Sequence, residues 1–148
     1  MTTLFLLCGL PGSGKTTLAK QLECERRALR LSPDEWMWSL SIDLYDEGKR
    51  AAIEALQWQV AARALNLGVN VVLEFGFWSR RERDDYRSRA EALGARVELL
   101  YLDVSRDELW RRLNERNADL PAATGRMDEA NLDRWWRRFE PPTPDELI

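Results

Sequence analysis

The octapeptide at residues 9–16, Gly-Leu-Pro-Gly-Ser-Gly-Lys-Thr, constrains the fold of this chain more than any other segment. Its glycines, lysine and threonine have the spacing G-x-x-x-x-G-K-[ST], in which the backbone turns sharply and points N–H groups at phosphate oxygens. The apolar run Leu4–Cys8 precedes it, and apolar residues at helical spacing follow it as far as Leu22. The sequence therefore predicts a buried strand, a phosphate-binding loop and a helix in succession.

The end of this loop carries the side chains with the most specific expected roles. Lys15 is expected to reach the β- and γ-phosphates, the Thr16 hydroxyl to ligate Mg²⁺, and Thr17 to add a further donor. The helix that starts here presents the positive end of its dipole to the anion. The residues predicted to bind ATP in this segment are Gly9, Gly12, Ser13, Gly14, Lys15, Thr16 and Thr17.

Apolar runs and helical patterns alternate along the rest of the chain, which predicts an α/β fold with a parallel sheet. Strands are predicted near residues 3–8, 28–31, 69–73 and 97–102. Helices are predicted to about residue 24 and near 49–67, 79–93, 105–116 and 128–139, with a broken helical segment before residue 46. Ligands of such a sheet bind at the carboxyl ends of the strands.

Two helices have apolar spacings that predict which side is buried. In the helix at 49–67 the predicted core face consists of Ile53, Leu56, Val60, Ala64 and Leu67, with Trp58 on the opposite side. In the helix at 128–139, Leu132, Trp135, Trp136 and Phe139 recur at core spacing.

Length and composition restrict the function further. A chain of 148 residues has room for one domain, and its net charge of -3 does not favour a nucleic-acid partner. Histidine is absent, so any general base is a carboxylate. No apolar stretch is long enough to cross a membrane and no signal peptide is apparent, so we expect a cytoplasmic protein. Cys8 and Cys24 fit no zinc spacing and are expected to be structural.

Three carboxylates follow or end predicted strands, where ligands are expected. Asp34 lies after the second strand and could accept a proton from a substrate hydroxyl, although Ser32-Pro33-Asp34-Glu35 is also a good helix start. Glu74 ends the third strand and is predicted to contact Mg²⁺ through water, with pairing to an arginine as the alternative. Asp103 ends the fourth strand, where helix capping is the favoured role.

Arginines and aromatic residues supply the other candidates. Arg112 and Arg116 share a helix face before a loop that contains Arg126, so they could close over a triphosphate, or could pair with Glu108 and Glu115 on the helix surface. Aromatic residues flank Asp34 and Glu74 and could line a substrate pocket or belong to the core: Trp36, Trp38, Phe75, Phe77 and Trp78.

Taken together, residues 9–17, 31–34 and 71–83 with the Arg112/Arg116 helix resemble a family of small phosphate-loop kinases. That family includes chloramphenicol phosphotransferase-like enzymes and polynucleotide 5'-kinase domains. The resemblance implies a three-layer P-loop kinase fold with a helical lid, here near residues 117–126. It also implies that Asp34 activates the acceptor hydroxyl and that Arg112, Arg116 and Arg126 contact the nucleotide phosphates.

The resemblance leaves the sheet and the acceptor open. A fifth strand would follow the lid, yet residues 140–148 contain three prolines and are expected to be extended, so four or five strands are predicted. The leading hypothesis is a kinase that transfers the γ-phosphoryl group of ATP to a small molecule such as an antibiotic, a sugar or a nucleoside-like compound. A polynucleotide 5'-hydroxyl kinase and a non-catalytic nucleotide-binding module are the alternatives. The sequence does not indicate the oligomeric state.

Overall fold

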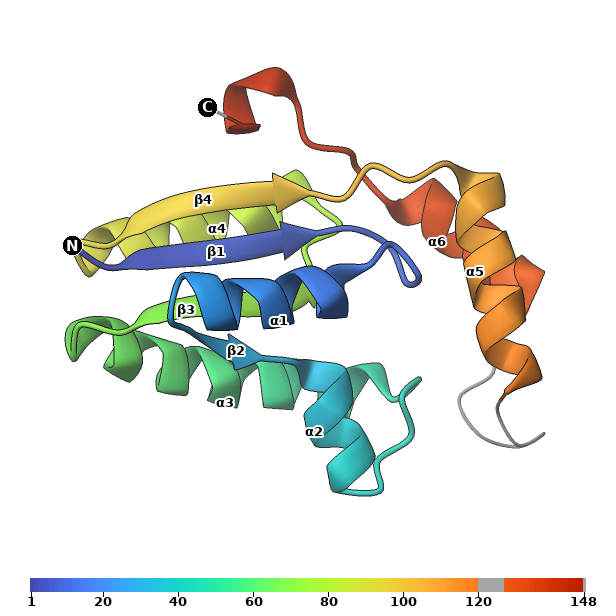
Figure 1. Ribbon diagram of the computed structural model, residues 1–148, viewed down its shortest axis with the longest axis horizontal. Coiled ribbons are helices and arrows are strands. Elements are labelled where there is room, and N and C mark those ends of the chain that lie inside the picture. The colour runs from blue at the N-terminus through green and yellow to red at the C-terminus, as the bar shows by residue number, and fades with distance from the viewer. Residues whose placement is uncertain (120–126, 148) are drawn as a thin grey trace.

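The computed structural model describes residues 1–119 and 127–147 and contains a parallel sheet with helices on both faces (Figure 1). Its strands are β1 (Thr3–Cys8), β2 (Ala28–Leu31), β3 (Asn70–Gly76) and β4 (Arg96–Tyr101). The strand order is β2-β3-β1-β4, and all three pairings are parallel. The predicted α/β fold is confirmed, with a sheet of four strands in the described part of the chain.

The helices begin where the sequence supplies capping side chains. The described residues form α1 (Lys15–Glu25), α2 (Pro33–Ser39), α3 (Glu47–Asn66), α4 (Arg80–Ala92), α5 (Arg106–Ala118) and α6 (Glu129–Arg138). From α2 onward each is preceded by a serine or aspartate whose side chain accepts a backbone N–H of the first turn: Ser32, Asp46, Ser79, Ser105 and Asp128.

Alternation along β1 separates the two faces of the sheet. Leu4, Leu6 and Cys8 face a core shared with α3 and α4, whereas Phe5 and Leu7 face a core shared with α1. Both faces of β1 are buried, and this explains why its sequence is a nearly continuous apolar run. The three layers are therefore α1, the sheet, and the pair α3 and α4.

Helices α5 and α6 lie beyond the carboxyl ends of the strands (Figure 1). They share a separate core in which Leu109 and Leu113 of α5 and Leu132 of α6 pack against Leu10 of the phosphate loop, residues 9–16. This core joins the two helices to the loop. No helix among the described residues is both long and apolar enough to span a membrane.

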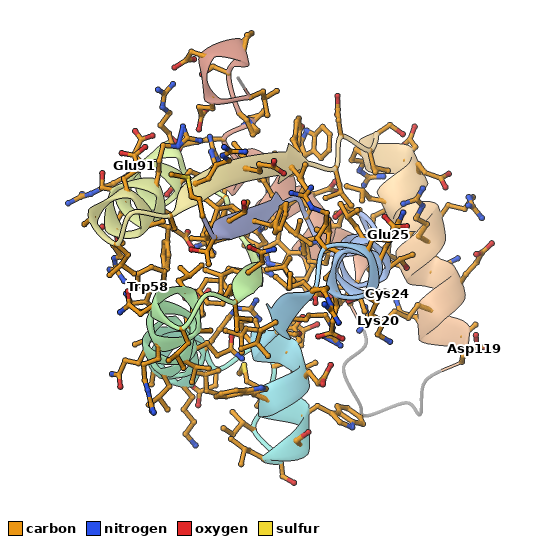
Figure 2. All side chains as sticks on the ribbon, turned by 60° about the vertical axis from the view of Figure 1, so that its left-hand side comes forward. Lys20, Cys24, Glu25, Trp58, Glu91 and Asp119 are labelled. Atoms are coloured by element: carbon orange, nitrogen blue, oxygen red, sulfur yellow. The ribbon has the colours of Figure 1, made fainter. Side chains whose placement is uncertain are left out.

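The predicted core face of α3 is wrong in part. Ile53 and Ala64 are buried as expected, but Leu56 is 53% exposed and Leu67 is 80% exposed. Trp58, predicted on the opposite side, lies between α3 and α4 (Figure 2). Its ring packs edge-on against Tyr86 of α4. The helix carries two apolar stripes, and contact with both the sheet and α4 selects the stripe that includes the small side chains of Ala61 and Ala64.

Two further expectations near the C-terminus differ from the structure. Trp136 is 42% exposed, because Leu132 and Trp135 form the side of α6 that packs into the core shared with α5. Residues 144–147, expected to be extended, form a short 3₁₀ helix, η1 (Pro144–Leu147), that buries Glu146. Of the two cysteines, Cys8 is buried in β1 and Cys24 is exposed at the end of α1.

Candidate active site

A cavity of about 810 Å³ opens at the carboxyl ends of the strands, where the phosphate loop meets α3, α5 and α6. It brings together most of the residues that the sequence singled out. The predicted site residues among those that line it are Gly12, Ser13, Gly14, Lys15, Thr16, Thr17, Asp34, Glu74, Arg112 and Arg116. Gly9 lies directly behind the lining, since its carbonyl accepts a hydrogen bond from Lys15. Arg126 and most of the predicted lid lie outside the described residues.

The backbone of the phosphate loop has the conformation that its glycines predict. Gly12 has φ 85° and Gly14 has φ 100°, a region that favours glycine. A Cβ on Gly12 would also lie 3.2 Å from Leu113 of α5. Gly14 occupies the N-cap of α1 without a capping side chain, so the first N–H groups of the helix remain available to an anion.

Ser13 provides an independent indication that the loop binds a polar ligand. Its side chain is buried, and its Oγ has no hydrogen-bond partner among residues 1–119 and 127–147. Leaving a buried hydroxyl unpaired is costly. A phosphate oxygen in the loop would satisfy it, as the phosphate-loop motif predicts.

Lys15 is held inside the cavity, where its Nζ donates to the Gly9 carbonyl at 2.8 Å. Burial lowers the pKa of Lys15 to about 8; Asp34 and Glu74 oppose the shift and Arg50 reinforces it. Desolvation thus outweighs the effect of the two nearby carboxylates. The negative charge of a polyphosphate would favour the protonated form.

Thr16 and Glu74 meet where Mg²⁺ is predicted to bind. The Thr16 hydroxyl donates to Glu74, and Arg30 of β2 lies 3.3 Å from the same carboxylate. Burial raises the pKa of Glu74, while Thr16 and Arg30 oppose the shift. The alternative of an arginine pair is therefore observed, while the Mg²⁺ contact of Glu74 stays a prediction that its position beside Thr16 supports.

These oxygen donors suit Mg²⁺ chemically. Mg²⁺ prefers hard oxygen ligands and is usually held by one or two protein groups together with phosphates and water. Among the described residues there is no group of three or more His, Cys, Asp or Glu side chains that could hold a metal ion without a bound nucleotide. Any Mg²⁺ here would therefore be bound by Thr16 and Glu74 together with the nucleotide.

Asp34 lies in the first turn of α2 and lines the cavity. The helix is capped by Ser32, whose Oγ accepts the Glu35 N–H at 3.3 Å, so the Asp34 side chain is not needed as the cap. Arg50 of α3 donates a hydrogen bond to Asp34 instead. The carboxylate is thus positioned at the cavity by a partner from another helix.

Five charged residues of the cavity were not identified from the sequence: Glu47, Arg50, Glu54, Glu82 and Arg138. Arg50 bridges Asp34 and Glu54, whose carboxylate lies 3.7 Å from its Nε. Burial raises the pKa of Glu54 to about 7, Arg50 opposes the shift, and Glu82 and Asp34 add to it. We refer to this side of the cavity, formed by Asp34, Arg50, Glu54 and Glu82, as the acceptor end.

A helical spacing in the sequence could have revealed the α3 residues. Glu47, Arg50, Ala51 and Glu54 recur at steps of three and four and all line the cavity. The stripe looks like an ordinary solvated helix face when the position of α3 is unknown. Its proximity to the loop comes from the packing of α3 beside the sheet.

The two predicted arginines of α5 line the cavity beside residues 11–17 of the loop and the start of α1, and we call this side of the cavity the phosphate end. Arg112 donates to the Gly12 carbonyl at 3.2 Å and to Glu108 at 3.0 Å, so the loop contact and the surface pair occur together. Arg116 lines the cavity one turn later. Asn117 and Met127 share two hydrogen bonds, of 2.6 and 3.1 Å, which join the end of α5 to the start of the following segment.

The aromatic residues divide between wall and core. Phe75, Trp78 and Trp135 line the cavity, and the rings of Trp78 and Trp135 lie 6.2 Å apart. Phe77 is fully buried in the core, whereas Trp38 is 59% exposed. The prediction of an aromatic wall is therefore confirmed only for Phe75 and Trp78.

A family model described as an AAA domain, AAA_33, matches residues 4–142, which is nearly the whole chain. The chain belongs to this P-loop kinase family. The predicted resemblance to small phosphate-loop kinases is thereby confirmed.

Solved structures of proteins of several kinds share the fold. A gluconokinase from Sinorhizobium meliloti 1021 has a TM-score of 0.67 at 19% identity, over 98% of this chain and 79% of that chain. A chain of the Pnkp1/Rnl/Hen1 RNA repair complex has a TM-score of 0.76 at 19% identity, over 93% of this chain and 43% of that chain. Chaetomium thermophilum Kti12 in complex with ADP-AlF3 has a TM-score of 0.72 at 24% identity, over 96% of this chain and 82% of that chain.

Within this AAA-domain fold the fourth strand does not contribute its carboxylate to the site. Asp103 is exposed, accepts a hydrogen bond from Tyr101 at 3.4 Å and does not line the cavity. Its expected capping role is taken by Ser105, whose Oγ accepts the Glu108 N–H at 3.2 Å. The site therefore gathers around β1, β2 and β3.

Proposed function

We propose that the protein is a Mg²⁺-dependent kinase that transfers the γ-phosphoryl group of ATP to a hydroxyl of a small molecule. The observation that carries the proposal is a single cavity that contains both the phosphate loop and Asp34. A phosphoryl transfer needs a bound triphosphate and an oriented acceptor within reach of one another. The kinase relatives and the nucleotide-bound relative in the same fold support this reading.

The phosphate end of the cavity would bind the triphosphate. The N–H groups at the start of α1 and the Ser13 hydroxyl would hold phosphate oxygens, and Lys15 would turn from the Gly9 carbonyl to the β- and γ-phosphates. Arg112 and Arg116 would add positive charge from α5. Mg²⁺, when bound, neutralises charge on the β- and γ-oxygens.

Asp34 would orient the acceptor hydroxyl and take its proton. As that oxygen attacks the γ-phosphorus, a new O–P bond forms, the bond to the bridging oxygen breaks, and ADP leaves. Lys15 and Arg112 would stabilise the charge that develops on the transferred group. The chain contains no histidine, so a carboxylate has to perform this proton transfer.

The charges at the acceptor end support a small neutral or cationic acceptor. Three carboxylates lie at this end, those of Asp34, Glu54 and Glu82, against the one cation Arg50. Glu47 and Arg138, which also line the cavity, pair with each other. A polynucleotide would bring further phosphates to this acidic wall, and proteins usually bind such phosphates with Lys and Arg. The fold likeness to a chain of an RNA repair complex keeps a polynucleotide 5'-hydroxyl as the second candidate acceptor.

The proposal is tested by acceptor-dependent ATP consumption. Wild-type protein is incubated with MgATP and with sugars, amino sugars, nucleosides, hydroxyl-bearing antibiotics and a 5'-hydroxyl oligonucleotide, one at a time. Lys15→Ala serves as the blank. We expect one small-molecule class to stimulate ADP release in the wild type only, with the phosphorylated product seen by mass spectrometry.

The other outcomes identify the alternatives. Stimulation by the oligonucleotide alone would replace the small-molecule acceptor with a polynucleotide. Tight MgATP binding with no consumption above the blank for any acceptor would favour a nucleotide-binding regulatory module.

A further inference from the structure

A buried ion pair joins α4 to the C-terminal segment, which we define as residues 140–147. Arg83 is 1% exposed and Glu146 is 2% exposed. The guanidinium donates twice to the carboxylate, from Nε at 2.7 Å and from Nη2 at 3.3 Å. The Thr143 N–H also donates to this carboxylate, at 2.8 Å. Bidentate geometry with every oxygen engaged is the arrangement in which a buried pair is tolerated.

Other side chains of α4 hold the same segment from its outer side. Arg80 donates to Thr143 and to Asp145, each at 2.8 Å, and Arg87 donates to the Glu146 carbonyl at 3.2 Å. The segment consequently lies against α4 and β4, at the edge of the sheet (Figure 1). The Arg80–Asp145 pair is exposed and serves as an internal comparison for the buried pair.

Arg83 also reaches the turn that follows β3. Its Nη1 donates to the Phe77 carbonyl at 2.9 Å. Phe77 has φ 50°, a left-handed conformation that costs energy for a residue with a side chain. The next residue is held from the C-terminal segment itself, because the Glu140 N–H donates to the Trp78 carbonyl at 2.8 Å. The segment thus contacts Trp78 directly, through Glu140, and Phe77 through Arg83, the partner of Glu146.

The turn contacts the phosphate loop at Gly9. The Gly9 N–H donates to the Gly76 carbonyl at 3.0 Å, and the Trp78 indole Nε1–H donates to the Gly9 carbonyl at 3.3 Å. A Cβ on Gly76 would lie 3.1 Å from that indole nitrogen and 3.3 Å from the Gly9 oxygen, so the approach is close. The Gly9 carbonyl therefore has two donors, Trp78 and Lys15.

These contacts form one connected path. We propose that the C-terminal segment positions the phosphate loop, acting through Arg83 and Trp78 on the Gly9 carbonyl. When Lys15 leaves that carbonyl for a phosphate, the Trp78 indole remains as its partner, so the buried acceptor is not left unpaired and the release of Lys15 costs less. Glu146 and Trp78 are positioning residues for nucleotide binding, and this inference rests on the proposed nucleotide site.

The test compares MgATP affinity by calorimetry in full-length variants. Glu146→Gln removes the negative charge that pairs with Arg83, and Trp78→Phe keeps an aromatic ring but removes the indole N–H. Each is expected to raise the Kd for MgATP about tenfold. The matched controls are Asp145→Asn, on the exposed pair of the same segment, and Trp136→Phe, on the exposed side of α6. Both controls should stay within about twofold of wild type.

Two readouts separate positioning from a loss of stability. The indole N–H resonance of Trp78, assigned by its absence in Trp78→Phe, should shift in Glu146→Gln and stay in place in Asp145→Asn. The double variant Glu146→Gln with Trp78→Phe should lose about tenfold in affinity, as each single variant does, because both interrupt one path. Two independent losses would multiply to about a hundredfold and would overturn the proposal.

Further outcomes keep the inference falsifiable. A folded Glu146→Gln protein with wild-type Kd and an unmoved Trp78 resonance would overturn it. If that variant does not fold, the paired replacement Arg83→Met with Glu146→Leu removes both buried charges, and it must show the same tenfold rise or the proposal is wrong. If wild-type protein itself does not bind MgATP, the proposed function fails and this inference fails with it.

Discussion

The phosphate end of the cavity is built mainly from backbone, whereas the acceptor end is built from side chains of three helices. At the phosphate end, Gly12 and Gly14 take conformations that favour glycine, and Leu113 leaves no free space beside Gly12. At the acceptor end, Arg50 of α3 connects Asp34 of α2 to Glu54, and Glu82 of α4 adds a further carboxylate. Backbone geometry suits any nucleoside triphosphate, while charged side chains can select one acceptor.

The largest expected effect comes from Asp34, at the acceptor end. Asp34→Asn keeps the size of the side chain but cannot accept a proton, so turnover with the true acceptor should fall about 100- to 10,000-fold while MgATP affinity stays near wild type. Steady-state kinetics with the acceptor found in the screen measure this. Asp103→Asn, at a strand end outside the cavity, is the control. Turnover within a few-fold of wild type would show that Asp34 does not take part in the chemistry, and the acceptor end would lose its proposed base.

Lys15 tests the phosphate end. Lys15→Ala should weaken MgATP binding about a hundredfold, because a charge-assisted contact to the β- and γ-phosphates is lost. Lys20→Ala, on the exposed side of α1, should bind as wild type does. Calorimetric titration distinguishes the two. Equal affinity of a folded Lys15→Ala protein would show that the loop does not bind the triphosphate.

Glu74 lies where the phosphate end meets the acceptor end, so its variant shows to which of the two ends the carboxylate belongs. Glu74→Gln should raise the Mg²⁺ concentration needed for half-maximal activity about 10- to 100-fold, because the carboxylate that faces Thr16 loses its charge. Activity is measured against Mg²⁺ at saturating ATP and acceptor. A variant that keeps the wild-type Mg²⁺ requirement and loses only acceptor affinity would assign Glu74 to the acceptor end.

The smallest effect concerns the stability cost of the acceptor end. The pKa of Glu54 is raised from 4.5 to about 7, so between these values the folded protein binds more protons than the unfolded chain, and stability falls as pH rises through this window. Glu54→Gln should therefore be more stable than wild type at pH 8, by about 1 to 2 kcal/mol, with no gain at pH 4.

Thermal or urea unfolding at both pH values checks this prediction. Glu91→Gln, on the exposed side of α4, is the control and should show no such pH dependence (Figure 2). An equal gain at both pH values would point to a packing change, and no gain at pH 8 would show that the Glu54 carboxylate carries no electrostatic cost.

Most of the fold could be predicted because strand and helix periods are local. The apolar runs at residues 3–8 and 28–31 coincide with β1 and β2, and serine or aspartate caps start the later helices. The buried face of α3 could not be predicted, because Leu56 and Ala61 both belong to plausible stripes. The choice depends on how closely the helix approaches the sheet and α4, which no local pattern records.

The phosphate end follows from local sequence, because the residues that shape it are consecutive and glycine, lysine and threonine have few alternative uses in that spacing. The acceptor end and the support behind the loop depend instead on tertiary contacts. Arg50 meets Asp34 across 16 residues and Arg83 meets Glu146 across 63. Charges become a site when folding brings them together in a partly buried place, since burial strengthens their interactions and shifts their pKa values.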